Sequence, residues 1–117
     1  MPRTTINPTS CPGPYPIAAV DLPFVAADIV NKNQVKWTGK ELVIAWNTDG
    51  VNSYTATVSS ANDSHNRSGN IGPKTIAAGA VAIMAGPLPN DGWRQSDGYI
   101  YCEASNVAVK FAVITLP

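Results

Sequence analysis

The chain's only histidine, His65, is the first residue to consider for catalysis. It follows Asp63 and Ser64, so the residue types of a hydrolytic triad occur together. A working triad needs a nucleophile, a base and an orienting group held in place by a rigid scaffold. Here the three are near neighbours in the polar loop of residues 60–72. We therefore interpret His65 as a solvated loop residue, and we expect no enzymatic activity.

Metal-ligating residue types are sparse. Zinc needs several His or Cys ligands, and the chain has one histidine and two distant cysteines. Loop oxygens can hold calcium at the ends of a β-sandwich, and the chain has candidates in Asp49, Asp63, Asp91 and Asp97. Aspartate is also among the commonest turn formers, and no EF-hand spacing occurs. We expect no metal and no other cofactor, with calcium at these turns as the open alternative.

The cysteines are predicted to be thiols. Met1–Ile6 has no apolar core of the signal-peptide kind, so we expect synthesis in the cytoplasm, where thiols stay reduced. Cys102 shares a strand face with Ile100 and Ala104, which predicts a buried side chain. A bridge between Cys11 and Cys102, formed after release into an oxidising medium, is the alternative.

Charge is scarce. Charged residues make up 14% of the chain, against about 25% in a typical soluble domain, and the net charge is zero. Scattered basic residues argue against nucleic acid as a partner. The longest weakly polar run, residues 76–85, is too short to cross a membrane. Low charge has two readings: a surface covered by neighbours, or a neutral β-protein rich in Ala, Thr, Ser and Asn.

The elements that position these residues are strands. Val107, Val109, Phe111 and Val113 alternate with other residues, the period of a strand with two faces. Further short strands are predicted over 35–37, 41–47, 51–59, 74–77, 80–85 and 99–104. Three turns predict hairpins: Thr48-Asp49-Gly50, Ala78-Gly79 and Ser96-Asp97-Gly98. Seven or eight short strands predict an all-β fold, a single antiparallel β-sandwich or jelly roll.

Residues 1–20 are predicted to form an extended, proline-rich arm, and residues 21–117 the sandwich domain. Proline fixes φ and removes a hydrogen-bond donor, so the arm cannot enter the centre of a sheet. A disordered tail suits residues 1–10 better than the rest. The apolar residues Tyr15, Ile17, Leu22 and Phe24 need a surface, either the chain's own sandwich or a neighbouring subunit. Residues 22–31 fit either one helical turn or a short edge strand.

An ordered set of short motifs covers most of residues 36–117. The set comprises Thr38-Gly39-Lys40-Glu41-Leu42, Asn47-Thr48, Thr55-Ala56-Thr57-Val58-Ser59-Ser60, the run from Gly92 to Tyr101, Ala104-Ser105-Asn106, and the run from Val109 to Pro117. In this set the chain resembles a group of small structural proteins of tailed phages. The resemblance implies a structural protein of the phage head and carries no catalytic residue over.

The role that the resemblance implies is that of a capsid decoration (cement) protein. Such a protein is made in the host cytoplasm, binds the major capsid protein on the outside of the head and stabilises the shell. We expect a homo-oligomer, a trimer around a capsid symmetry axis. Partner contacts are predicted at the arm and an apolar surface, through Tyr15, Ile17, Leu22, Phe24 and Trp93.

Two other functions stay open. One is a head-fibre or tail recognition module that binds host glycan through exposed aromatic residues, among them Trp37, Trp93, Tyr99 and Tyr101. Aromatic residues in hairpins of small sandwiches also serve as cross-strand packing pairs. The other is a tail or connector component present in a few copies per particle. Copy number in purified virions would separate these functions.

Overall fold

The two longest strands, β5 (Glu41–Asn47) and β10 (Val109–Thr115), form an antiparallel pair over their whole length. Their β-branched and aromatic residues suit a pleated, half-buried surface. Val43 and Ala45 of β5, with Phe111 and Val113 of β10, are buried on the inner face. This pair forms the centre of one of two sheets.

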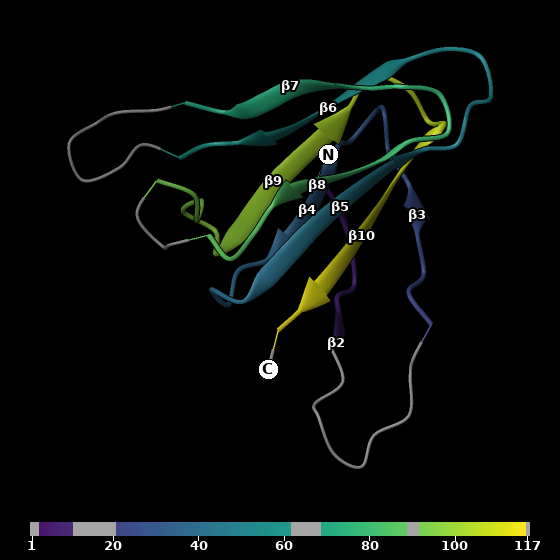
Figure 1. The fold of residues 1–117 in the computed structure, drawn as a ribbon. Coiled ribbons are helices and arrows are strands. Elements are labelled where there is room, and N and C mark those ends of the chain that lie inside the picture. Colours follow the sequence, from purple (N-terminus) through teal and green to yellow (C-terminus); the bar gives the residue numbers. More distant parts are fainter. Residues whose placement is uncertain (1–2, 11–20, 62–68, 89–91, 117) are drawn as a thin grey trace.

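The protein is a β-sandwich (Figure 1), described by a computed structural model over residues 3–10, 21–61, 69–88 and 92–116. Sheet A has the strand order β1-β4-β9-β6-β7, and sheet B has the order β2-β10-β5-β8 with β3 also beside β10. The other strands are β1 (Thr4–Thr5), β2 (Thr9–Ser10), β3 (Val25–Ala26), β4 (Asn33–Lys36), β6 (Tyr54–Ser59), β7 (Ile71–Ile76), β8 (Val81–Ala85) and β9 (Tyr99–Ala104). The described residues contain no helix, so the all-β prediction is confirmed.

The core lies between the sheets. Alternate residues of β6 and β9 point into it, as the period of two predicts: Ala56 and Val58, with Ile100, Cys102 and Ala104. The described residues form ten strands, compared with the seven or eight predicted, because three of them have only two residues. Two of these short strands pair in parallel, β1 with β4 and β2 with β10, so the sheets are not purely antiparallel.

The three predicted hairpins are wrong. Each predicted turn occurs where the chain changes direction, but β5, β8 and β10 belong to sheet B, whereas β6, β7 and β9 belong to sheet A. The first two turns therefore connect strands of different sheets. At the third, Gly98 N–H donates to the Gln95 carbonyl at 2.9 Å and β9 begins at Tyr99, but residues 93–95 are not a strand. Among the described strands, β6 and β7 are consecutive along the chain and pair antiparallel in one sheet.

The turn after β5 crosses between the sheets, and the Asn47 side chain forms hydrogen bonds on both sides of the crossing. This side chain is fully buried at the end of β5. Its Nδ2 donates to the carbonyls of Asn52, at 2.8 Å, and of Ile76 in sheet A, at 3.0 Å. Its Oδ1 accepts from Asp49 N–H at 3.0 Å. A buried amide needs such partners, and here they hold the end of β5 against the end of β7.

Residues 3–10 are part of the sandwich, which is evidence against the alternative of a disordered tail at the start of the chain. Thr4 N–H donates to the Lys32 carbonyl at 3.0 Å, and Ile6 N–H donates to the Gln34 carbonyl at 2.8 Å. Ile6 is 1% exposed. Residues 3–10 thus add β1 to sheet A and β2 to sheet B, and we call them the N-terminal strap. Residues 11–20 of the predicted arm lie outside the described residues.

Of the two alternatives for residues 22–31, the edge strand is correct. Val25 and Ala26 form β3 beside Phe111 and Lys110 of β10. A turn follows, in which Lys32 N–H donates to the Asp28 carbonyl at 2.9 Å.

Candidate functional site

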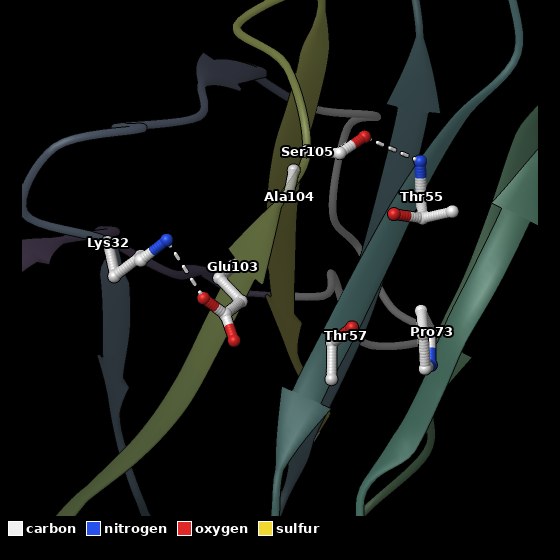
Figure 2. A pocket seen from close by; sticks show the side chains of 7 residues that line it. All are labelled: Lys32, Thr55, Thr57, Pro73, Glu103, Ala104 and Ser105. Carbon is white, nitrogen blue, oxygen red and sulfur yellow. Dashed lines mark hydrogen bonds and ion pairs between the residues drawn. The ribbon is translucent and has the colours of Figure 1, made fainter.

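The outer face of sheet A carries a shallow groove of about 270 Å³ (Figure 2). It runs over β9 and β6 towards β7, with Lys32 at one end and Pro73 at the other. Its lining is Lys32, Thr55, Thr57, Pro73, Glu103, Ala104 and Ser105. Hydroxyls and one ion pair therefore dominate this surface.

The groove can bind polar groups but lacks the parts of a hydrolytic site. Lys32 Nζ lies 3.1 Å from Glu103 Oε2, and Thr55 N–H donates to Ser105 Oγ at 2.9 Å. The Ser105 hydroxyl keeps its own proton for donation to a ligand. No histidine or cysteine lines the groove, so it has no nucleophile paired with an imidazole base. The arrangement suits a small polar ligand held by hydrogen bonds.

The outer face of sheet B has the opposite character, and we call it the apolar face. Its residues are Leu42, Ile44 and Trp46 of β5, Val81 and Ile83 of β8, and Lys110, Ala112 and Ile114 of β10. They lie in cross-strand rows such as Val81–Trp46–Lys110 and Ile83–Ile44–Ala112. Lys110 is the one charged residue in this set. The sequence feature that could have predicted this face lies in β5. Leu42, Ile44 and Trp46 alternate with Val43 and Ala45, so apolar residues lie on both faces of the strand.

Phe24 and Leu22, two of the predicted partner-binding residues, are half-buried. The Phe24 ring meets the ring of Trp46 edge to face, with centroids 5.3 Å apart. Phe24 therefore extends the apolar face beyond β10. Trp93 is half-buried and packs against the core. Tyr15 and Ile17 lie outside the described residues.

The aromatic residues proposed for glycan binding are engaged within the chain. Trp37 packs against the core, and its Nε1 donates to the Leu88 carbonyl at 2.9 Å. The Arg3 guanidinium lies 4.0 Å from the centre of the Tyr101 ring, and Lys36 Nζ lies 5.7 Å from that of Tyr99. These cations occupy ring faces on which a sugar would stack.

Two of the calcium candidates are used in turns. Asp49 accepts hydrogen bonds from the backbone N–H groups of Asn52 and Val51, and these lower the pKa of its carboxyl. Asp97 accepts from Tyr99 N–H at 3.2 Å and from the Tyr101 hydroxyl at 2.6 Å. Within the described part of the chain, no group of three or more His, Cys, Asp or Glu side chains comes together. Asp63, Asp91 and His65 lie outside that part.

Cys102 is fully buried, as the strand pattern predicts, and burial raises the pKa of its thiol to about 12. Cys11 lies outside the described residues. None of the described residues belongs to a helix that could cross a membrane.

No protein-family model, no curated protein and no solved structure gives a significant match to the chain. The two outer faces are therefore the basis for a functional proposal.

Proposed function

We propose that the protein is a phage virion component that decorates the outside of the capsid and stabilises the shell. The observation that carries this proposal is the difference between the two sheet faces. Sheet A presents hydroxyls, Tyr99, Tyr101 and charged groups. On the apolar face of sheet B, Val81 and Ile83 are exposed, Leu42, Trp46 and Ile114 are half-buried, and Ile44 and Ala112 are buried. A small monomer gains solubility from charge and loses it through a contiguous apolar surface. The exposed and half-buried part of this face is suited to being covered by a partner.

The partner that we propose for the apolar face is the major capsid protein. Phe24 and Trp46 supply two large, half-buried rings to the contact, and aromatic residues are among those that contribute most to binding. Sheet A would then face solvent. The action is mechanical: binding the expanded shell, but not its precursor, stabilises the expanded form by mass action. No bond is made or broken. We retain the prediction of a trimer on the shell.

The test is co-sedimentation of the purified protein with undecorated heads of its phage, combined with the melting temperature of those heads. We expect saturable binding at high copy number and a raised melting temperature. Leu42→Lys places a charge on the half-buried edge of the apolar face and should weaken binding at least tenfold. Thr57→Lys adds the same charge on the outer face of sheet A and should bind normally. Equal binding by both variants would contradict the role of the apolar face.

The glycan-binding alternative draws support from one feature, the hydroxyl-lined groove of sheet A. It predicts adsorption to host cells, inhibition by soluble glycan and no change in capsid melting temperature. In that case Thr57→Lys, and not Leu42→Lys, would be the defective variant. The same pair of variants therefore separates the two functions.

A further inference from the structure

We propose that β8 pairs with the β8 strand of a second copy of this chain, antiparallel about a two-fold axis. Among the described strands, β8 pairs only with β5, on the side away from β10 (Figure 1). An edge strand presents unpaired N–H and C=O groups that can template a further strand. The inference concerns contacts between copies and does not depend on capsid binding.

The backbone of β8 shows which groups are available. Asn47 N–H donates to the Ala80 carbonyl at 3.0 Å, so Ala80 is a residue that faces β5. In an antiparallel ladder, alternate residues hydrogen-bond to the same neighbour. Ala82 therefore also turns towards β5, and the N–H and C=O groups of Val81 and Ile83 point outwards from the sheet.

This alternation sets the register of the pair. Val81 lies opposite Ile83 of the second copy, Ile83 lies opposite Val81 of the second copy, and Ala82 lies on the axis opposite itself. Each Val81–Ile83 pair can exchange two backbone hydrogen bonds. Sheet B would then continue from one copy into the other.

Side chains and charge favour a second copy as the occupant. Val81 is 57% exposed and Ile83 is 69% exposed, and both would pack against their counterparts on the apolar face. A two-fold contact brings residues near the axis close to the same residues of the second copy, so a charged residue there would meet a like charge. From residue 75 to residue 90 the chain has no Lys, Arg, Asp or Glu. The pair therefore forms without like-charge repulsion.

The other described edges are protected. β7 contains Pro73, which has no N–H, and the charged Lys74. β1, β2 and β3 have two residues each. With one open edge, a copy can extend its sheet only through β8 of another copy, which closes as a two-fold pair. This contact differs from the three-fold contact of a trimer, and both together would give a six-membered assembly.

The first test measures the mass of the full chain by light scattering and sedimentation up to about 100 µM, where a contact of this small area should be populated. We expect a dimer, or a larger assembly built from such dimers, whose population rises with protein concentration. For Ile83→Lys we expect an at least tenfold higher dissociation constant. Val107→Lys adds a charge at another residue that is 57% exposed and should associate normally. A monomer throughout, or an assembly unchanged by Ile83→Lys, overturns the proposal.

The second test fixes the register. In a Cys11→Ser background, Ala82→Cys should form a disulfide between copies, because paired Cα atoms of this type lie about 4.5 Å apart. Val81→Cys, offset from the axis, should cross-link far less, and equal cross-linking overturns the register. If Ile83→Lys fails to fold by circular dichroism, Val81→Pro replaces it, since proline there removes an outward N–H. Association by folded Val81→Pro as strong as that of the unmodified chain overturns the proposal.

Discussion

Glu41 is an acidic residue among the buried side chains, with 1% of its surface exposed, and Asn33 and Asn47 are the other buried polar residues among those described. Its oxygens accept hydrogen bonds from the backbone N–H groups of Thr38, Gly39 and Lys40, the last two at 3.1 Å each. The side chain thus satisfies the donors of the turn that enters β5. A buried acidic residue of this kind organises backbone, and it needs no catalytic explanation.

We predict that Glu41→Ala lowers the free energy of unfolding by about 3 kcal/mol, because three backbone donors lose their acceptor. Urea denaturation measures the loss. Glu103→Ala is the matched control, since that carboxylate is about one-third exposed and pairs with a similarly exposed Lys32. It should change stability by less than about 1 kcal/mol. Equal losses would mean that the turn does not depend on Glu41.

Cys102 should make stability depend on alkaline pH. Burial raises the pKa of its thiol to about 12, whereas an unfolded thiol titrates near 8.5, about that of free cysteine. Above pH ~8.5 the native state holds a proton that the unfolded state has lost. Stability should therefore fall as pH rises from there towards the folded pKa, by up to about 1.4 kcal/mol per pH unit. Cys102→Ala should remove this part of the slope in urea titrations at several pH values. An unchanged slope in Cys102→Ala would contradict the assignment.

At the scale of elements, the N-terminal strap closes one side of the sandwich. Arg3 donates from Nη1 to the Asn33 carbonyl at 3.1 Å, and Ile6 inserts into the core. Deleting residues 1–20 to test a role of the arm would also remove this strap and destabilise the fold. Point substitutions at Leu22 and Phe24 are the cleaner test of partner binding by that region.

We predict that Ile6→Ala destabilises the protein by about 3 kcal/mol, since it leaves a cavity among buried side chains. Ile29→Ala removes the same atoms at a residue that is 38% exposed and should lose less than about 1 kcal/mol. Urea midpoints measure both. Similar small losses would show that the strap is detached in solution.

Gly72 lies in β7, within the irregular part of its pairing with β6. Its φ is +96°, and a Cβ there would lie 2.7 Å from the Ala56 carbonyl oxygen and 2.6 Å from Lys74 N. We predict that Gly72→Ala lowers stability by more than about 1 kcal/mol, because both contacts are with backbone. At Gly86 an added Cβ would have no atom within 4 Å apart from those of the adjacent residues, so Gly86→Ala should be nearly neutral. The comparison can be made by thermal melting, and equal melting temperatures would contradict it.

At the scale of the whole molecule, apolar contacts and a balance of eight basic and eight acidic residues should govern association. We predict that neither shell binding nor β8 pairing weakens as NaCl rises from about 50 mM to about 500 mM, since there is little charge attraction to screen. Ammonium sulfate should strengthen both. Sedimentation across a salt series checks this. A tenfold loss of binding in salt would point instead to ion pairs.

The sequence by itself determined the local structure. Glu41–Asn47 was predicted as a strand with its observed bounds, and the buried alternation of Ala56 with Val58, and of Ile100 with Cys102, followed from the period of two. The edge strand near Val25 was one of two alternatives. These features depend on neighbouring residues, whose spacing is visible in the chain.

Only the tertiary structure decided which strands pair. A turn such as Asp49-Gly50 specifies a change of direction, but not whether the next strand joins the same sheet. At this turn Asn47 connects the two sheets through a hydrogen bond to the carbonyl of Ile76, 29 residues away. The strap, the groove and the edge position of β8 likewise depend on contacts between distant residues. Such contacts leave no periodic signal, because burial between sheets is a property of the assembled pair.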